Sequence, residues 1–508
     1  MLKRFTPIIF LITTSLFIPL SCVEENLTKP KDRTSSDQLG GKSSDIGTLS
    51  NRPRVLVPSL HVRTVISRLT TPIAVAFIAD NDILVLEKNT GKVLRVTNGA
   101  VKGTALDLAV NFASERGLLG IALHPNFPDN PSVYLYWTES SSGGDTNILS
   151  QTPLLGNRVD RFVWDGTSGT LTQDNNLIRL RAFQQDAGQP ERGNHDGGVL
   201  KFGPDGKLYI FIGDVGRRGQ LQNLPCGPVP DCKGGTVPDD QFGGPEPDNA
   251  HLTGVILRLN DDGSTPPDNP FYNVGASMGT EAGRNIQKIY SYGHRNSIGM
   301  AFDPFSGNLW LQENGDDSFS ELNRIVAGMN GGWIQIMGPV SRIRQYKEIE
   351  TSTQFFGLQQ IRWSPENIAN SPKQALSRLF MLPGATFVNP EFSWKYEVSP
   401  GGIGFVKGNA LGPELEGNLI MGAATDALEG GHLFRFRLSG DRRSIAVDDA
   451  RLKDRVADNL TKFDITESET LLFGTDFGVA SDVQSGPDGN IYVVSISHGS
   501  VYEIFRSK

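Results

Sequence analysis

The sequence predicts an all-β fold, a six-bladed β-propeller with long inter-strand loops. Glycine accounts for 57 of the 508 residues and proline for 30, and this richness in turn residues favours many short strands over long helices. A second observation is a repeated unit of a short apolar strand, a Pro/Gly/Asp turn and a strand of β-branched and aromatic residues. Such units, tens of residues apart and without a sustained helical period, are typical of radial repetition.

The repeated unit occurs six times. Its clearest copy, GGVLKFGPDGKLYIFIGD, covers residues 197–214, and its proline fixes φ at the second turn position while Asp-Gly closes the turn. Six units predict six blades of four strands each. A large β-sandwich or a β-helix is the alternative, although a β-helix requires a shorter and more regular period. The other copies lie at residues 71–88, 117–137, 297–315 and 481–496, with one strand of a sixth unit at 412–425.

The spacing of the units is uneven, so several blades must carry insertions. Residues 215–252 are rich in Gly, Pro and Asp, and residues 340–390 are irregular. We expect both stretches to form surface loops. Cys226 and Cys232, in PCGPVPDCKGG within the first stretch, are predicted to form a disulfide, because an exported chain folds in an oxidising compartment.

The N-terminus has the pattern of an export signal. Lys3 and Arg4 precede the apolar run IIFLITTSLFIPL, which is short for a membrane span. We therefore expect residues 1–22 to form a signal peptide and the protein to be exported, as a periplasmic or outer-membrane lipoprotein or as a secreted protein. Cys22 is the candidate lipidation site, which would anchor the protein to a membrane. Pro19 stands where that motif usually has an aliphatic residue, so a simple secretory signal is the alternative.

Two further segments complete the predicted organisation. Residues 23–55 are polar and low in apolar content, which predicts a flexible linker, and residues 56–508 are assigned to the propeller. The chain carries a formal charge of −8 and a pI near 5.5. This mildly acidic balance argues against nucleic acid as a partner.

The repeat also shows which residues occupy equivalent positions in different units, and these residues are candidates for a shared site. His195, Arg295 and Arg116 occupy one register, at the entry to the first strand of their units. In a propeller these entries converge on the mouth of the central channel, so the three side chains are predicted to surround one pocket. Alternatively, His195 is a solvated loop residue and Arg116 takes part in a surface salt bridge. The three residues precede the turn prolines Pro204, Pro304 and Pro125 by nine positions each.

Several motifs carry a family resemblance. GLLGIALHPNF, GNHDGGVLKFGPDGKLYIFIGD, YGHRNSIGMAFDP, ENGDDSFSELNRI followed by GMNGGW, and GPDGNIYVVS resemble the soluble quinoprotein glucose/sorbosone dehydrogenases, or aldose sugar dehydrogenases, over roughly residues 65–505. The fold of that family is a six-bladed propeller. The resemblance implies oxidation of an aldose at its anomeric carbon to a lactone, with electrons passing to pyrroloquinoline quinone (PQQ) held by calcium. It leaves the sugar and the final electron acceptor open.

The resemblance also implies residue roles. His195 is implied as the general base, for which a neutral imidazole is suited. Arg295 is implied to stabilise the quinone oxygen that gains negative charge. The backbone carbonyls of Gly315 and Asp316 match calcium-binding positions, and calcium prefers oxygen ligands; an acidic turn without an ion is the alternative. The cofactor-binding set comprises Arg295, Asn296, Glu115 and Asn194.

The sequence departs from the family at its cofactor contacts. The family has an Arg-x-Arg-Asp element where this chain has Val479-Ala480-Ser481-Asp482, and Glu429 with two glycines stands in a region where the family tends to have lysine. Each lost cation removes a charge-assisted contact worth about 1.5–3 kcal/mol. Arg435 and Lys407 are the candidates for compensation.

Two further functions are therefore left open. One is a non-catalytic propeller that binds a carbohydrate or a protein. The other is lactonase-type hydrolysis at a central metal, which requires several inward carboxylates. The candidates for that metal site are Glu115, Asp196 and Asp482.

Overall fold

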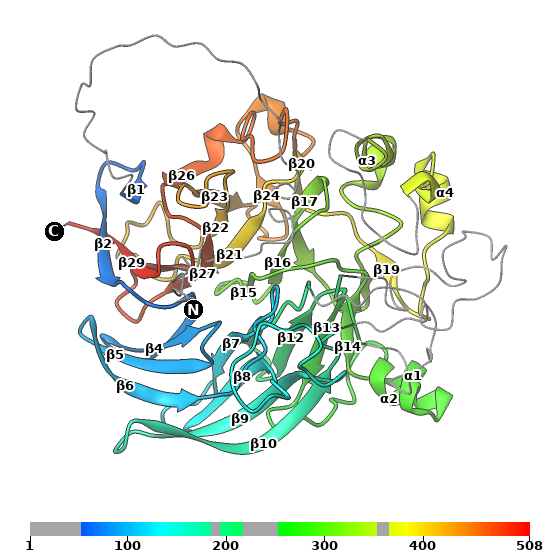
Figure 1. Cartoon of the computed structure of the whole chain (residues 1–508). Coiled ribbons are helices and arrows are strands. Elements are labelled where there is room, and N and C mark those ends of the chain that lie inside the picture. The colour runs from blue at the N-terminus through cyan, green and yellow to red at the C-terminus, as the bar shows by residue number, and fades with distance from the viewer. Residues whose placement is uncertain (1–51, 184–193, 217–251, 353–364, 508) are drawn as a thin grey trace, which may run out of the picture.

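The computed structural model describes residues 52–183, 194–216, 252–352 and 365–507. Within them, twenty-nine strands form sheets grouped around a common centre (Figure 1). The prediction of a β-propeller is confirmed. The predicted signal peptide of residues 1–22, most of the predicted linker and the cysteine pair lie outside the described residues. None of the helices in the described ranges has the length and apolar character needed to cross a bilayer.

The first three sheets along the chain follow one another in sequence. Each begins with the hairpin of the repeated unit and adds strands outward. Their strands are β3 (Pro72–Ala79), β4 (Asp82–Glu87), β5 (Lys92–Thr97) and β6 (Ala100–Asp107); β7 (Leu118–Leu123), β8 (Ser132–Thr138), β9 (Asn157–Asp165) and β10 (Thr170–Leu180); and β11 (Leu200–Phe202), β12 (Leu208–Ile212), β13 (Val255–Leu259), β14 (Ile289–Tyr292), β18 (Met329–Asn330) and β19 (Thr386–Phe387).

The remaining three sheets include both ends of the described chain. They comprise β15 (Met300–Phe302), β16 (Leu309–Glu313), β17 (Ser318–Ile325), β20 (Phe392–Tyr396) and β25 (Val456–Ala457); β21 (Pro400–Phe405), β22 (Leu419–Ala423), β23 (His432–Leu438), β26 (Leu472–Thr475), β1 (Arg54–Val55) and β24 (Ile445–Ala446); and β27 (Ala480–Ser485), β28 (Ile491–Ser495), β29 (Ser500–Arg506) and β2 (Leu60–Ile66). β1 corrects the predicted linker, because its two residues pair with β26.

The inner strands of the six sheets form a closed ring. β3 contacts β7, β7 contacts β11, β11 contacts β15, β15 contacts β21, β21 contacts β27, and β27 contacts β3. All six residues of β4 and all five of β12 are buried, because sheets pack on both faces of these central strands. The core therefore lies between neighbouring sheets, and the inner strands surround the axis of the ring.

The segment 340–390 is not simply a loop, as the sequence had indicated. It contains α3 (Ile343–Glu350) and α4 (Pro372–Ser377). α3 buries Ile343, Tyr346 and Ile349 along one face, a pattern too short to stand out in the sequence. Two further short helices, α1 (Tyr272–Met278) and α2 (Glu281–Ile286), precede β14. The chain is thus mostly β rather than all-β.

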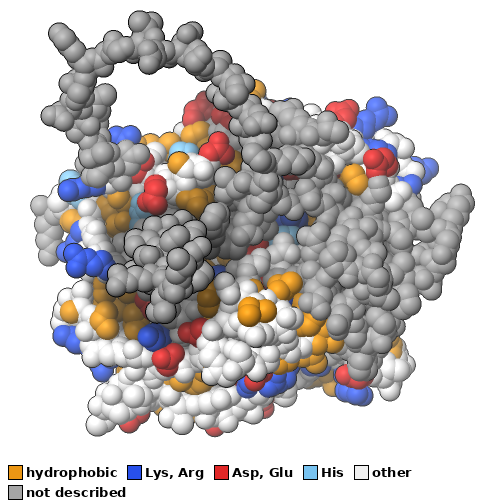
Figure 2. Space-filling view, viewed as in Figure 1, with side chains coloured by type: hydrophobic (Ala, Val, Ile, Leu, Met, Phe, Trp, Pro, Cys, Tyr) orange, Lys and Arg blue, Asp and Glu red, His pale blue; other side chains and the backbone are white. Residues whose placement is uncertain are grey.

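Side chains of both charges are scattered over the described surface. In the view of Figure 2, Lys and Arg lie interspersed with Asp and Glu among the coloured side chains. This distribution agrees with the mildly acidic composition of the sequence.

Candidate active site

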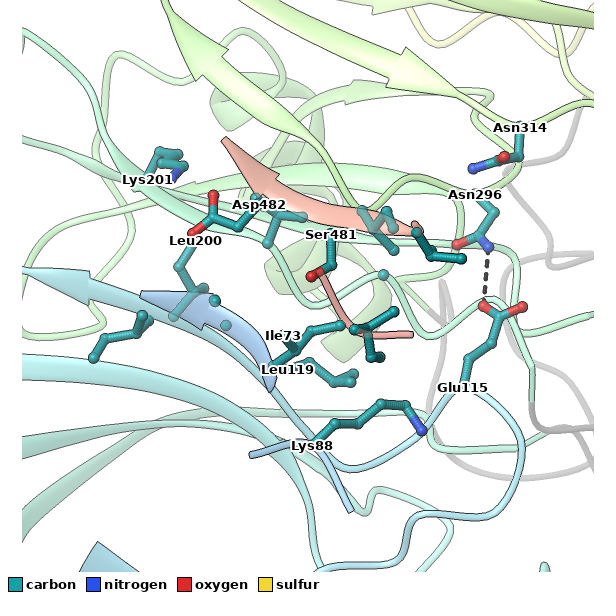
Figure 3. A pocket seen from close by; sticks show the side chains of 18 of the residues that line it. Ile73, Lys88, Glu115, Leu119, Leu200, Lys201, Asn296, Asn314, Ser481 and Asp482 are labelled. Atoms are coloured by element: carbon teal, nitrogen blue, oxygen red, sulfur yellow. Dashed lines mark hydrogen bonds between the residues drawn. The ribbon is translucent and has the colours of Figure 1, made fainter. Parts of the chain in front are cut away.

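A pocket lies on the axis of the ring, with a volume of about 990 Å³ that includes the part open to solvent. Inner strands or the loops that precede them contribute its lining. Ile73, Leu119 and Leu200 give it apolar walls. Figure 3 shows Glu115, Asn296 and Asn314 at one side of the pocket, and Lys201 with Asp482 at the opposite side. A mostly apolar cavity with a few polar groups is typical of a small-molecule site.

The polar side of the pocket brings three sequence-predicted residues together. The Glu115 carboxylate oxygen Oε2 accepts a hydrogen bond from the Asn296 side-chain amide at 2.9 Å (Figure 3). The same oxygen accepts the backbone N–H of His195 at 2.9 Å. His195 has a φ of 62°, a left-handed conformation that is uncommon outside glycine and is often found at functional sites. Asn194 lies beside this group, next to Gly216.

The His195 imidazole is buried and paired with a carboxylate. Its Nδ1 lies 2.5 Å from Oδ1 of Asp214. Asp214 also accepts the backbone N–H of Gly216 at 2.8 Å and the indole N–H of Trp333 at 2.9 Å. Because two N–H groups already donate to Asp214, its Oδ1 is placed to accept a proton carried on Nδ1 of His195. In a neutral ring, Nε2 is then the basic nitrogen, as a general base requires.

Several contacts fix the side chain and the backbone of Arg295. Its guanidinium donates to the backbone oxygen of Asn314 at 3.2 Å and to Oδ1 of Asp316 at 3.1 Å. Its backbone N–H donates to Oε1 of Glu313 at 3.1 Å. Its Cζ atom lies 5.5 Å from the centroid of the Trp333 ring, within the range of a cation–π contact. Neither the Arg295 nor the His195 side chain lines the pocket itself; Glu115 and Asn296 do.

The shared register of His195 and Arg295 has a direct structural counterpart at Gly213. A Cβ atom there would lie 2.4 Å from the backbone oxygen of His195 and 2.8 Å from that of Arg295. The two loops therefore approach each other across a position that only glycine can occupy. The shared register thus places the two backbones next to each other, although the prediction was that the side chains surround a pocket, and neither lines it.

Arg116 makes other contacts. Its guanidinium is buried and donates to the backbone oxygen of Ala182, at 2.8 Å from Nε, and to that of Leu149 at 3.2 Å. The interpretation as a surface salt bridge is therefore wrong, and, like the side chains of His195 and Arg295, that of Arg116 does not line the pocket. Arg116 instead satisfies backbone carbonyls in the interior, which a buried guanidinium can do because it carries five donors.

Comparison with known proteins identifies the family. The family model described as Glucose / Sorbosone dehydrogenase matches residues 69–365. The chain belongs to this family. It is 36% identical over 281 residues to quinoprotein glucose dehydrogenase B of Acinetobacter calcoaceticus, a match that covers 54% of this chain and 52% of that protein. The resemblance read from the sequence motifs is confirmed, and the match spans about half the length of the Acinetobacter protein.

Solved structures agree with the fold. A putative oxidoreductase (glucose dehydrogenase) from Thermus thermophilus superposes with a TM-score of 0.56 at 26% identity, covering 88% of this chain and 100% of that one. The PQQ-bound form of aldose sugar dehydrogenase from Streptomyces coelicolor superposes with a TM-score of 0.53 at 24% identity, covering 88% of this chain and 98% of that one.

This glucose/sorbosone dehydrogenase family member differs from the pattern at the pocket wall. Val479 and Ser481, which replace the expected arginines, both line the pocket, as does Asp482. Asp482 accepts hydrogen bonds from the backbone N–H of Val75 at 3.1 Å and from the Gln484 side chain at 2.6 Å. The substitutions therefore fall on the pocket itself.

The proposed compensating cations lie elsewhere. Neither Arg435 nor Lys407 lines the pocket, whereas Lys88 and Lys201 do, so the first two residues were wrong choices. The Glu429 side chain is 79% exposed and pairs with His498 at 3.4 Å, well outside the lining. Lys88 donates to the backbone oxygen of Ser114 at 3.0 Å.

The predicted calcium position at Gly315 and Asp316 lies beside several buried acids. Asp317 forms an ion pair with Lys462, and burial raises the Asp317 pKa to about 7. Glu350, also buried, has a raised pKa and accepts the backbone N–H groups of Asp317 and Ser318 at 3.1 Å each. Within the described ranges, no three His, Cys, Asp or Glu side chains are grouped to hold a metal ion. A site here would therefore depend on backbone oxygens.

The carboxylates considered for a hydrolytic metal do not form one site. Asp482 serves the backbone of β3, while Asp196 lies off the pocket and accepts from the Asn157 amide at 2.8 Å. Burial raises the pKa of Asp196 to about 7. Glu115 is the member that lines the polar side of the pocket, and its Oε2 is bound to His195 and Asn296.

Two residues of the site were missed in the sequence. Asp214 could have been found, because the β11–β12 hairpin pairs Leu200 with Ile210 and so brings the residues before β11 next to those after β12. Trp333 ends GMNGGW, one of the motifs that carry the family resemblance, but no role was assigned to it, because no repeat or spacing connects it to the His195 loop.

Proposed function

We propose that this protein oxidises an aldose sugar at its anomeric carbon to the lactone, with pyrroloquinoline quinone as electron acceptor. The observation that carries the proposal is the His195–Asp214 pair, at 2.5 Å, which is next to Arg295 and joined to the pocket lining through Glu115. Family membership and the name of the Acinetobacter relative, a quinoprotein glucose dehydrogenase, support the reaction class. We also infer that the six sheets are six blades, as in this family.

The lining of the pocket fits the quinone in its apolar walls and in part of its polar groups. The Asn296 side-chain oxygen lies at the pocket side of the site and is buried without a hydrogen-bond partner in the described part of the chain, so it is ready for a donor on a ligand. Apolar walls suit a flat ring system. Lys88 and Lys201 are offset by Glu115 and Asp482, so the three carboxylates of the quinone lack a net positive lining. We propose that calcium at the Gly315 and Asp316 carbonyls supplies that charge.

In this proposal, each residue of the site has a separate role in the reaction. When bound, the quinone supplies a two-electron acceptor for the hydride of the sugar. His195 takes the proton of the anomeric hydroxyl at Nε2, and Asp214 stabilises the imidazolium that results. Arg295 places a fixed positive charge where negative charge develops, which is most effective in a buried site. Glu115 and Asn296 orient the groups at the pocket side.

A direct experiment separates this function from a non-catalytic binding propeller. Purified protein is mixed with calcium and excess quinone, its absorption spectrum is recorded, and aldoses are then added with an artificial electron acceptor. Spectral change and sugar-dependent turnover are expected. If neither occurs, the dehydrogenase is abandoned for the binding propeller, which Val479 and Ser481 in the pocket lining favour.

We further propose that the protein is exported and that Cys22 is lipidated, since Lys3, Arg4 and the apolar run before Cys22 form the pattern of such a signal. Fractionation of cells that produce the Cys22→Ser variant tests the anchor. Loss of membrane association is expected, and unchanged association would leave simple secretion or another attachment.

A further inference from the structure

Two residues connect the predicted base to the predicted electrostatic residue. Asp214 accepts from His195 through Oδ1, and its other oxygen, Oδ2, accepts the indole N–H of Trp333 at 2.9 Å. The face of the same indole lies 5.5 Å from the Arg295 Cζ atom. All four side chains are buried. A single aromatic side chain thus contacts both Arg295 and Asp214, the partner of His195.

Two backbone hydrogen bonds also join these segments. The N–H of Asp214 donates to the oxygen of Arg295 at 2.8 Å, and the N–H of Trp333 donates to the oxygen of Gly293 at 3.0 Å, two residues before Arg295. Trp333 is therefore fixed to the Arg295 loop by its backbone and to Asp214 by its side chain. A tight, buried network of this kind restricts each member to one orientation.

We infer that Trp333 is a positioning residue that sets the basicity of His195 through Asp214 and holds the Arg295 guanidinium. The inference rests on the proposed function for its catalytic meaning. Its physical basis is the indole N–H, which can only donate and therefore stabilises Asp214 as the carboxylate. Part of the negative charge of Asp214 is thereby satisfied by Trp333 rather than by an imidazolium, which moderates the basicity of His195.

The test compares two tryptophan variants. Trp333→Phe keeps an aromatic face for Arg295 and removes the N–H. Trp394→Phe is the matched control, because Trp394 is equally buried and its indole N–H has no hydrogen-bond partner in the described part of the chain. Both proteins are purified as the full chain, and thermal melting checks that each is folded.

The decisive readout is the His195 ring rather than activity. The seven histidines of the chain are labelled with ¹⁵N, and the His195 signal is assigned by its loss in His195→Gln. In Trp333→Phe we expect the titration midpoint of His195 to rise by about one pH unit, since a hydrogen bond to a charged group is lost. Trp394→Phe is expected to match wild type. An unchanged His195 titration in a folded Trp333→Phe protein overturns the inference.

Turnover provides a second readout in the presence of quinone and calcium. The acid limb of the pH profile of kcat should move upward with the His195 titration, which lowers kcat about tenfold below neutral pH. KM for the sugar should change less. If wild type shows no turnover, the proposed function fails while the NMR titration still decides the inference.

A second variant keeps the test decisive if Trp333→Phe does not fold. His195 bonds to Oδ1 of Asp214 and Trp333 to Oδ2, so in Asp214→Asn one of these two positions carries an NH2 donor and no longer accepts. The Nδ1–H signal of His195 is then expected to shift or disappear. Its persistence at the wild-type position, with the wild-type titration, would overturn the inference as well.

Discussion

The two sides of the axial pocket differ in how completely they follow the family. On the side of β11 and β15, His195, Asp214 and Arg295 form a connected set in which every named contact is a hydrogen bond or a ring contact. On the side of β27, Val479 and Ser481 stand where arginines are expected. Under the proposed function, the residues assigned to proton transfer are present in this chain, whereas two cations expected to hold an anionic cofactor are absent from the pocket wall.

The largest expected effect is a loss of turnover when His195, on the side of β11 and β15, is replaced. His195→Ala is expected to lower turnover by about 10²–10⁴-fold, the usual contribution of a general base. Steady-state kinetics with saturating quinone and calcium measure it. His61→Ala is the control, because His61 is exposed on β2 and should behave as wild type. A His195→Ala enzyme that keeps wild-type turnover would remove this residue from the mechanism.

The second largest effect is expected when arginines are introduced on the β27 side of the pocket. The double variant Val479→Arg and Ser481→Arg should tighten quinone binding about tenfold or more, because each charge-assisted contact contributes about 1.5–3 kcal/mol. Titration of apoprotein with the quinone at fixed calcium gives the Kd. Val479→Gln with Ser481→Gln controls for size without charge. Equal Kd values for the arginine and glutamine proteins would show that charge at these positions is not what limits binding.

Calcium removal tests both sides together. If calcium binds near Gly315, chelation should lower Tm by a few degrees and weaken quinone binding, since the ion offsets carboxylate charge. Differential scanning calorimetry with and without chelator measures the first effect. A magnesium arm shows whether the ion is selected. A melting curve that does not move between chelator and millimolar calcium would argue for an acidic turn without an ion.

The smallest expected effect concerns Asp196, which lies on the side of β11 and β15. Its pKa is about 7 in the folded chain because of burial, against an ordinary value of 3.8. The folded state therefore retains a proton that the unfolded chain has released, so stability falls as pH rises from about 4 to about 7. Asp196→Asn should flatten this decline in Tm, whereas Asp129→Asn, at an exposed turn, should not. Parallel slopes for all three proteins would contradict the assignment.

More of the fold than of the candidate site could be predicted from the sequence. The hairpins were predictable because turn chemistry and strand alternation are local, and five complete units coincide with β3–β4, β7–β8, β11–β12, β15–β16 and β27–β28. His195 and Arg295 were predictable because a repeat transfers position from one blade to the next. Arg116 shows the limit of that transfer: its backbone shares the register, but its side chain turns toward the carbonyl of Ala182.

Other features depend on contacts that no repeat encodes. Trp333 reaches Asp214 from a loop 119 residues later in the chain. Lys88 and Lys201 line the pocket from different sheets, one after β4 and one on β11, and only the closed ring brings them to one cavity. Residue type alone does not distinguish them from other surface lysines.

The pairing of β2 with β29 has a consequence for how the chain is made. The sheet that closes the ring takes its outer strand from residues 60–66 and the adjacent strand from residues 500–506, so a ribosome has to synthesise more than four hundred residues after β2 before that sheet can form. Until then β2 has no partner and presents an open strand edge, a surface that favours aggregation. A nascent chain arrested before Ser500 should therefore remain protease-sensitive and bind chaperones, and resistance should arise in one step when β29 is released.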